Sequence, residues 1–523
     1  MLWSDSSARR IARVLPLWQD AAAAAPDGGQ LPPELAAELH RKIVGTVVMP
    51  GDPDYDQDRM LSNPRFSHFP AVIVYCEVES DVAECLAVAA QARMSVVVRS
   101  GGHSTGGFSS QSGFLIDVSR MDDVFVEPDK LRVWAGPGTN FRKLNAKLAS
   151  FGLHTPGGAC PDVCIGGYMQ GGGYGFTARI FGMNCDQVLA VRVMLADGRI
   201  VTADAERNRD LFWAVRGGTG SNFGVLIDVC YKLYRGNRFS GFSITWSMAG
   251  EAGVQATAGA LEWLQANFMR TAPEGLGYQM IWVFEGPEGQ PRQPLLLMRG
   301  MYRGSKDELA ALLEPVLARP GATLQAMYDP MPYTDLNRIL LSEPYEVPQF
   351  PPDATPMPPP EAKLSRYLDR PVSAAEWLPL LRHFLASPSP YTIAAMEIYG
   401  GAIEHPLQPN AFLHRTVDCD LFFDVFWLQP SDQAPMLAYL ADWEKLVAKI
   451  WSGRVYQNYP SPDDPDFGQH YWGEAYATLR AVKGKYDPGN RFCYPQSLPL
   501  PGLDEPTPDL PGLSDPIRAD EPA

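Results

Sequence analysis

The first half of the chain alternates short apolar runs with segments of helical periodicity. β-Branched and other apolar runs predict strands at residues 71–78, 95–99, 113–118, 131–136, 188–195, 200–203 and 224–234. Apolar residues spaced three and four apart predict helices at residues 80–94, 139–152 and 207–218. The turn Asp197–Gly198 lies between two of the strands and predicts a β-hairpin. Strands that alternate with helices to about residue 235 indicate an α/β or α+β fold in this half.

The second half, from about residue 240 to residue 450, predicts another α+β domain, built on a largely antiparallel sheet. Its expected strands lie at 242–246, 278–284, 294–302, 391–400 and 420–428, with a helix at 307–318. The proline-rich segment 344–363 cannot pair with strands, and we interpret it as a surface loop in preference to a lid over a site. Segment 499–523 is rich in Pro, Asp and Glu, and we expect it to be disordered.

Composition and charge exclude several functional classes. The 523 residues include 44 Lys and Arg against 60 Asp and Glu, so the formal net charge is −16. Because an acidic surface repels phosphate groups, we expect binding neither to nucleic acid nor to anionic membranes. No stretch is apolar enough to span a bilayer. Residues 11–20 predict a short amphipathic helix rather than a secretion signal, and we therefore expect a cytoplasmic protein.

Two glycine-rich loops contain the residues that suggest chemistry. In the first, residues 99–107, small side chains allow backbone N–H groups to converge on a pyrophosphate, although the loop lacks the strand-to-helix context of a Rossmann fingerprint. His103 lies in this loop, and Cys160 and Cys164 lie in the second loop, residues 157–175. Taken singly, such residues are more often a hydrogen-bonded histidine and buried thiols. The two loops together favour a cofactor site.

A metal site is the weaker interpretation of the same residues. Cys160, Cys164 and His154 are ligand types that zinc uses, but zinc sites generally pair such ligands with a second cluster, and the sequence has none. The other cysteines lie singly in apolar runs, as Cys76 and Cys85 do, and are expected to be buried thiols. We predict no metal.

Four motifs, in order along the chain, resemble those of one flavoprotein family. They are RSGGHS at 99–104, PGGACPDVCIGGYMQGGGYG at 156–175, GGTGSNFGV at 217–225, and YQNY with YDPGNRFCYPQSL at 456–459 and 486–498. Together they resemble the berberine-bridge-enzyme-like FAD oxidases of the vanillyl-alcohol-oxidase/PCMH superfamily. The resemblance implies an α+β protein with a two-part PCMH-type FAD-binding domain and a substrate domain whose antiparallel sheet is covered by helices. The implied division is an N-terminal arm at 1–66, the FAD domain at 67–237, the substrate domain at 238–450, a segment returning to the FAD domain at 451–498, and a disordered acidic tail at 499–523.

The resemblance also implies how FAD is held. Bicovalent members of the family join a histidine to the flavin 8α-methyl group and a cysteine to C6, and both side chains are nucleophiles able to add to an electrophilic flavin. The histidine corresponds to His103, and Cys160 fits the cysteine better than its rival Cys164. Tyr168 departs from the family's histidine, and Ile165 holds the position that resembles the family's oxygen gate. Further cofactor contacts carry over to Arg99, Ser100, Gly101, Gly102, Ser104, Gly166, Gly167, Tyr168, Gly172, Gly173, Val225, Asn458 and Asn490.

Oxidation of an alcohol by FAD needs hydride transfer to flavin N5 and usually a base for the hydroxyl proton. In the family this base is often a tyrosine of the YQNY-type motif, so we expect Tyr459 first and Tyr456 second. A free tyrosine titrates near about 10, so a cation or a hydrogen-bond donor must stabilise its phenolate at neutral pH. Tyr399 and Asp424 are further candidates from the predicted sheet. For Asp424, an ion pair with Arg415 is an equal alternative.

The resemblance thus implies an FAD-dependent oxidase that takes hydride from an alcohol- or phenol-type small molecule and reduces molecular oxygen to hydrogen peroxide. Oxidative ring closure in a natural-product intermediate, a dehydrogenase with another electron acceptor, and a flavin-binding protein without turnover remain alternatives. Sugars, phenols, and polyketide or alkaloid intermediates of secondary metabolism all remain as substrates.

Overall fold

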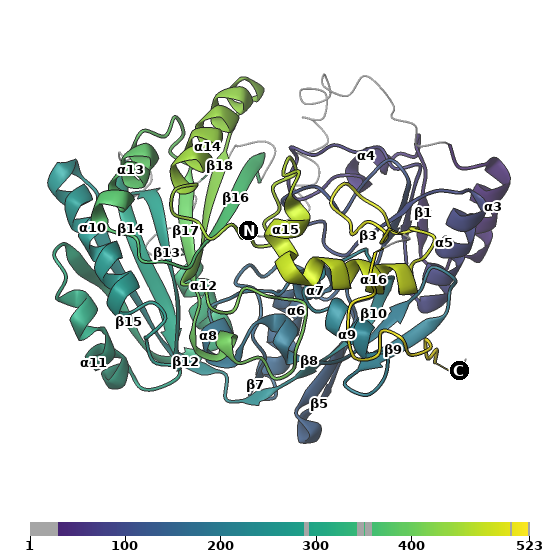
Figure 1. Cartoon of the computed structure of the whole chain (residues 1–523), viewed down its shortest axis with the longest axis horizontal. Coiled ribbons are helices and arrows are strands. Elements are labelled where there is room, and N and C mark those ends of the chain that lie inside the picture. Colours follow the sequence, from purple (N-terminus) through teal and green to yellow (C-terminus); the bar gives the residue numbers. More distant parts are fainter. Residues whose placement is uncertain (1–29, 287–291, 343–349, 351–357, 503–504, 521–523) are drawn as a thin grey trace.

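The computed structural model describes residues 30–286, 292–342, 350, 358–502 and 505–520. The helix expected at 11–20 lies outside them. The chain forms two lobes, which Figure 1 shows side by side. The first lobe contains the first half of the chain together with the C-terminal segment, and the second lobe contains one large sheet covered by helices.

A four-stranded sheet in the order β1-β2-β4-β3 opens the first lobe. Strand β1 (Thr46–Val48) is antiparallel to β2 (Val72–Tyr75), whereas β4 (Phe114–Asp117) is parallel to both β2 and β3 (Val96–Arg99). Helix α5 (Glu79–Gln91) connects β2 to β3 and packs its apolar face on the sheet. The strand–helix–strand unit is therefore as predicted. Part of the expected N-terminal arm at 1–66 is built into this sheet, because β1 pairs with β2. The sequence did not predict β1, since a three-residue strand shows too little periodicity to be recognised.

A five-stranded antiparallel sheet in the order β5-β6-β10-β8-β9 completes this lobe. The strands are β5 (Val124–Glu127), β6 (Arg132–Ala135), β8 (Val188–Met194), β9 (Ile200–Asp204) and β10 (Val225–Lys232). The hairpin predicted at Asp197–Gly198 joins β8 to β9. The short strands β7 (Leu153–His154) and β11 (Tyr234–Arg235) pair with each other as a separate two-stranded sheet. The helices of this lobe's first part are α3 (Pro33–Lys42), α4 (Tyr55–Asp58), α6 (Phe141–Ala149), α7 (Ile165–Gln170), α8 (Ala178–Phe181) and α9 (Arg209–Ala214).

The second lobe is a seven-stranded antiparallel sheet in the order β15-β12-β14-β13-β17-β18-β16. The strands are β12 (Arg238–Ser247), β13 (Leu276–Glu285), β14 (Gln293–Tyr302), β15 (Ala322–Pro332), β16 (Glu361–Leu368), β17 (Ile393–Ile398) and β18 (Cys419–Phe426). Four helices cover the face turned away from the first lobe (Figure 1): α10 (Gly250–Asn267), α11 (Lys306–Leu317), α13 (Ala374–Leu385) and α14 (Gln433–Val447). Helix α12 (Tyr333–Ser342) follows β15.

Side chains alternate between the two faces of this large sheet, as the period of two along a strand requires. Trp282 and its neighbours at even positions of β13 enter a core with Trp377 and Trp443 under the helices. The odd positions of β13, such as Gln279 and Ile281, face the first lobe. The inner face of this sheet is therefore turned toward the space between the two lobes.

The C-terminal segment returns to the first lobe through α15 (Phe467–Trp472) and α16 (Tyr476–Tyr486). The backbone N–H of Val96 in β3 donates to the carbonyl oxygen of Arg491 at 2.9 Å, so this segment lengthens the four-stranded sheet at its edge. The expectation of a disordered tail is wrong for residues 505–520. Leu513 is buried, and Asp520 accepts hydrogen bonds from the backbone and the hydroxyl of Thr202.

The proline-rich segment also differs from the expectation at its end. Residues 361–363 are the start of β16 and pair with β18. The sequence did not predict this start, because three extended residues at the end of a polar, proline-rich segment resemble the loop before them. Phe350, Pro358 and Pro359 border a cavity described below. In the described part of the chain, no helix combines the length and the apolar character needed to cross a bilayer.

Candidate active site

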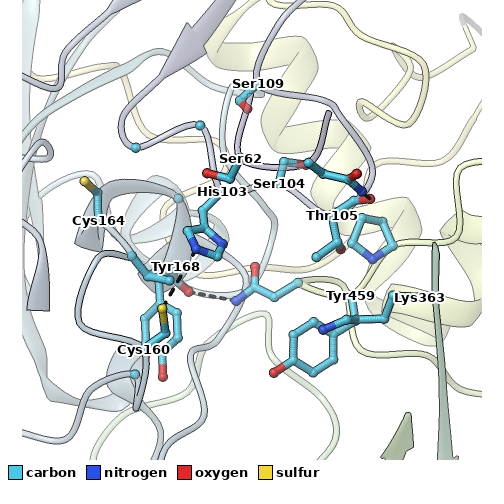
Figure 2. A pocket seen from close by; sticks show the side chains of 18 of the residues that line it. Ser62, His103, Ser104, Thr105, Ser109, Cys160, Cys164, Tyr168, Lys363 and Tyr459 are labelled. Atoms are coloured by element: carbon cyan, nitrogen blue, oxygen red, sulfur yellow. Dashed lines mark hydrogen bonds between the residues drawn. The ribbon is translucent and has the colours of Figure 1, made fainter. Parts of the chain in front are cut away.

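A cavity of about 590 Å³ lies between the two lobes. Both glycine-rich loops, the loop at 217–224 and the YQNY segment line it from the first lobe, and the inner face of the seven-stranded sheet lines it from the second. Figure 2 shows His103, Cys160 and Tyr168 on one side of the hollow and Tyr459 and Lys363 on the other.

Glycines allow the segments around this cavity to approach one another closely. A Cβ atom on Gly101 would lie 2.8 Å from the sulfur of Cys164, closer than real side chains come. A Cβ atom on Gly171 would overlap the side-chain amide of Asn458. The first loop, the second loop and the C-terminal segment are therefore in contact because glycine has no side chain at these points.

His103 and Cys160 come together from the two loops. Cys160 Sγ lies 3.9 Å from His103 Nε2, and both side chains face the open space of the cavity that they line, while protein surrounds them on the other sides. Burial alone would raise the pKa of the Cys160 thiol, but the contact with His103 outweighs it and lowers that pKa. Burial likewise opposes the charged imidazole, and Cys160 outweighs it, so the pKa of His103 is raised. The contact with His103 therefore makes the Cys160 thiol easier to deprotonate, and the thiolate is the nucleophilic form of cysteine.

Cys164 has a different environment. It precedes α7, and its sulfur donates to the carbonyl oxygen of Gly138 at 3.2 Å, to one side of the cavity in Figure 2. Burial, with nearby carboxylates, raises the pKa of this thiol to about 12, so it stays protonated. His154, the third residue of the metal interpretation, bonds Thr177 Oγ1 at 2.9 Å and lies away from the cavity. The described residues hold no group of three metal-ligand side chains.

Most of the cofactor residues implied by the motifs line the cavity. They are Ser100, Gly101, Gly102, His103, Ser104, Cys160, Cys164, Gly166, Gly167, Tyr168 and Asn458. Asn458 Nδ2 donates to the carbonyl oxygen of Tyr168 at 2.9 Å, which ties the YQNY segment to the second loop. The hydroxyl of Tyr168 donates to the carbonyl of Tyr174, so its proton is already used in a hydrogen bond. Five expected positions do not line the cavity: Ile165, Gly172, Gly173, Val225 and Asn490.

Arg99 is also absent from the cavity wall. Its buried guanidinium forms an ion pair with Asp117 and donates to the carbonyl of Asp58 at 2.7 Å and to the hydroxyl of Tyr75 at 3.2 Å. Its position at the end of β3 turns the side chain toward the neighbouring strands. The side chain of Arg99 therefore does not face the cavity, and it fixes the base of the loop that carries His103.

Tyr459 and Glu397 form the central polar pair of the cavity. Tyr459 Oη donates to Glu397 Oε1 at 2.8 Å, and the second carboxylate oxygen of Glu397 has no partner among the described residues. Burial raises the pKa of Glu397 to about 8, and Asp420, directly opposite on β18, adds to the rise. Burial and Glu397 also raise the pKa of Tyr459 well above its ordinary value. Sequence reasoning missed Glu397, although it is the lone charge in an apolar strand, which is the signal that singled out Asp424.

Lys363 is the cation nearest to this pair. Its Nζ lies 4.6 Å from the ring centroid of Tyr459 and 2.7 Å from Asp424 Oδ2. Asp424 is thus a buried partner of Lys363 behind the cavity wall, and the expected ion pair with Arg415 is wrong; Arg415 instead pairs with Asp186 at 2.7 Å. Sequence reasoning missed Lys363 because it placed this residue in an unpaired loop.

Tyr456 and Tyr399 do not have the surroundings of a base. The hydroxyl oxygen of Tyr456 accepts the backbone N–H groups of Gly173 at 2.9 Å and Tyr174 at 3.2 Å, so this residue holds the glycine loop. Tyr399 is fully buried, shares a hydrogen bond with Tyr367 at 2.8 Å and does not line the cavity. Of the expected catalytic candidates, only Tyr456 and Tyr459 line the cavity, and Tyr459 alone has its hydroxyl on a carboxylate.

The residues present fit FAD. Glycines of both loops leave backbone N–H groups open to a pyrophosphate. Thr105 and Ser109 line the same wall, and their hydroxyl oxygens have no partner in the described structure. His103 and Cys160 lie 3.9 Å apart at the cavity wall, and both residue types can bond covalently to a flavin. This two-lobed fold and its cavity define an FAD-linked oxidoreductase.

Comparison with known proteins agrees. The family descriptions "FAD binding domain" and "Berberine and berberine like" match residues 70–204 and 455–499. The FAD-linked oxidoreductase YvdP of Bacillus subtilis (strain 168) is 30% identical over 466 residues, 88% of this chain and 98% of that protein. A carbohydrate oxidase of Microdochium nivale is 27% identical over 86% of this chain and 92% of its own length. The structure of Physcomitrella patens BBE-like 1 has the same fold, with a TM-score of 0.78 and 24% identity over 90% of this chain and 99% of that one.

The chain belongs to the berberine-bridge-enzyme-like FAD-linked oxidoreductases. The fold and the family predicted from the four motifs are confirmed.

Proposed function

We propose that this protein is an oxidase with covalently bound FAD, attached through His103 and Cys160, and that it oxidises a hydroxyl group of a small molecule. The observation that carries the proposal is the hydrogen bond of 2.8 Å between Tyr459 Oη and Glu397 Oε1 in the cavity that also contains His103 and Cys160. A proton acceptor and two nucleophiles thus share one enclosed space.

The choice of Cys160 over Cys164 rests on reactivity. Addition to an electrophilic flavin needs a thiolate, and the contact with His103 lowers the pKa of Cys160. Cys164 remains a thiol, because its pKa is about 12 and its hydrogen is held by a backbone carbonyl. His103 supplies the second nucleophile from the opposite loop.

The proton of the substrate hydroxyl follows a short path. Tyr459 takes this proton and passes its own to Glu397 through the existing hydrogen bond, so no free phenolate is needed before substrate binds. Lys363, over the ring of Tyr459, stabilises any negative charge that develops on the phenol oxygen. Glu397 is well suited as the final acceptor because its pKa of about 8 lies near neutral pH.

FAD held by these residues would supply the redox chemistry, namely hydride acceptance from the carbon that bears the hydroxyl and return of both electrons to molecular oxygen, so that the alcohol would become a carbonyl compound and oxygen would become hydrogen peroxide. The carbohydrate oxidase of Microdochium nivale supports an oxidase and makes sugars one substrate class to test. The aromatic side chains Phe422 and Phe426 on the cavity wall favour planar, apolar alcohols as another.

Two measurements test the proposal. Acid-denatured protein is separated from its supernatant, and the flavin is expected to stay with the polypeptide; release of all the flavin would overturn the covalent assignment. Sugars, benzylic alcohols and phenols are then mixed anaerobically with the protein, and at least one class is expected to bleach the flavin absorption. Air should restore the absorption with formation of hydrogen peroxide. Reoxidation by an artificial electron acceptor but not by air would identify a dehydrogenase instead.

A further inference from the structure

A polar row crosses the inner face of the seven-stranded sheet. Arg299 on β14 lies opposite Gln279 on β13, Gln279 lies opposite Glu397 on β17, and Glu397 lies opposite Asp420 on β18. Arg299, Gln279 and Glu397 all line the cavity. Neighbouring strands are separated by roughly 4.8 Å, so Arg299 and Glu397 stand roughly 10 Å apart along this row.

Arg299 is a buried cation that forms no ion pair among the described residues, although Glu285 raises its pKa from a longer distance. It is 4% exposed, and it has no acidic partner within ion-pair distance in the described residues. One terminal nitrogen donates to the carbonyl of Leu340 near the end of α12, and the other donates to Gln279 Oε1 at 3.2 Å. A guanidinium has five N–H groups, so three form no hydrogen bond with the described residues, and the one on Nε is buried. Burial lowers the pKa of Arg299 only to about 10, so the group stays charged at neutral pH.

A buried guanidinium with unpaired N–H groups destabilises the folded protein unless a ligand or another group binds them. A buried charge without a partner destabilises a protein, and buried donors are almost always satisfied. The hydrogen bond to Leu340 uses one N–H group to bind a carbonyl near the C-terminal end of α12. This contact gives no role to the N–H groups that remain. The side-chain N–H₂ group of Gln279 lies beside them at the cavity wall, and no hydrogen bond from it is formed within the described residues.

The neighbouring row of the sheet is apolar. Ile281, Ala395 and Phe422 lie opposite one another on β13, β17 and β18, one step along the strands from the polar row, and all three line the cavity. A ligand that spans the site therefore meets an apolar surface along its body and polar groups at its two ends. One end is the Tyr459–Glu397 pair, and the other is Arg299 with Gln279.

We propose that Arg299 and Gln279 form an anion subsite of the substrate cavity, and that the substrate is an apolar, planar hydroxy acid whose carboxylate binds there while its reacting hydroxyl lies at Tyr459. The proposal rests on the proposed function for the position of the hydroxyl. Guanidinium recognises carboxylate through paired N–H donors, which matches the free donors here. On a chain with a net charge of −16, a buried cation is also what an acidic substrate requires.

The test uses two pairs of probes and the flavin-loaded protein. The pairs are 4-(hydroxymethyl)benzoate and 4-(hydroxymethyl)cinnamate, each with its methyl ester, which differ in length and in charge. Binding is measured without oxygen, as the change in flavin absorption on titration. In the native protein, at least one acid is expected to bind tenfold or more tightly than its ester. In Arg299→Gln this preference is expected to fall to within about twofold, with the affinity for the ester unchanged.

A matched control removes the same charge nearby. Arg303 is exposed just beyond the end of β14 and does not line the cavity, so Arg303→Gln is expected to keep the preference. If Arg299→Gln does not fold or does not load flavin, Gln279→Ala probes the same subsite and is expected to reduce the preference threefold or more. Equal binding of acid and ester to the native protein, failure of both acids to bind, or a full preference retained in the variants would overturn the proposal.

Ligand binding tests the anion subsite, and bleaching of the flavin absorption tests the oxidase, so the two proposals can fail separately. If the acids show the preference but no alcohol of any class bleaches the flavin, the oxidase proposal fails and the anion subsite stands. If neutral alcohols bind and are oxidised as well as the acids, the oxidase stands and the anion subsite is rejected.

Discussion

Glu397 offers the sharpest test of the proposed proton path. In the variant Glu397→Gln, the side chain keeps its size and can still accept the hydrogen bond from Tyr459, but it can no longer take a proton. Because a positioned general base contributes roughly 100- to 10,000-fold, we expect flavin reduction by substrate to slow by roughly 100-fold or more at pH 9. Affinity for the substrate should change little, since the hydrogen bond to Tyr459 remains possible.

The pH dependence follows from the raised pKa of Glu397. Only the carboxylate form can accept a proton, so activity must rise with pH through about 8. With this pKa, about one molecule in eleven has the carboxylate at pH 7 and about ten in eleven have it at pH 9, so the rate should increase about tenfold between them. The variant should lose this rise.

The assay is stopped-flow reduction of the flavin without oxygen, from pH 6 to pH 10, with the best substrate from the panel. Glu285→Gln is a matched control, because Glu285 is another buried carboxylate of the same sheet, with its pKa raised to about 7 by burial, but it lies outside the cavity. This control should keep the native profile. If Glu397→Gln retained an inflection near pH 8 at the native rate, the acceptor would be another group and the reasoning would be refuted.

Three further predictions concern the cofactor and stability. Cys160→Ser should leave the flavin attached through His103 alone, so peptide mass spectrometry should find one flavin-linked peptide where the native protein has two. Cys164→Ser should keep both linked peptides. The opposite result would assign the second bond to Cys164. Lys363→Met should lower the free energy of unfolding by roughly 3 kcal/mol in urea titration, because Asp424 loses its cation, and adding Asp424→Asn should recover part of the loss. Leu513→Ala should cost roughly 2 kcal/mol in the same assay, and no change would mean that the tail does not pack.

The sequence was sufficient for the parts of the site that depend on local motifs. His103 and Cys160 lie in loops whose glycines and flanking strands are visible in the sequence, and the structure brings these two side chains together. Arg99 shows the limit of the same approach: it belongs to the motif, but its side chain points to Asp117 on the neighbouring strand. A motif names the residues of a loop but does not give the direction of each side chain.

Pairings between distant strands could not be read in this way. Asp424 was recognised as an unusual carboxylate, yet its partner Lys363 lies on a strand whose start is masked by prolines, and register rather than proximity in sequence brings them together. Arg299, Gln279 and Glu397 likewise become one row only through strand order. The tail was misjudged because composition averages over a segment, whereas a few specific contacts hold the tail, among them buried Leu513 and the hydrogen bonds to Asp520.

The hydrogen bond between Val96 and Arg491 also bears on how the protein is made. The cofactor cavity takes walls from residues near 100, near 160 and near 458, and a strand edge of the first lobe is completed only by residue 491. A ribosome that has released only the first 450 residues has therefore exposed two of these walls without the third. The complete cavity, with all three of these segments in contact, can therefore form only after residues near 491 have emerged from the ribosome.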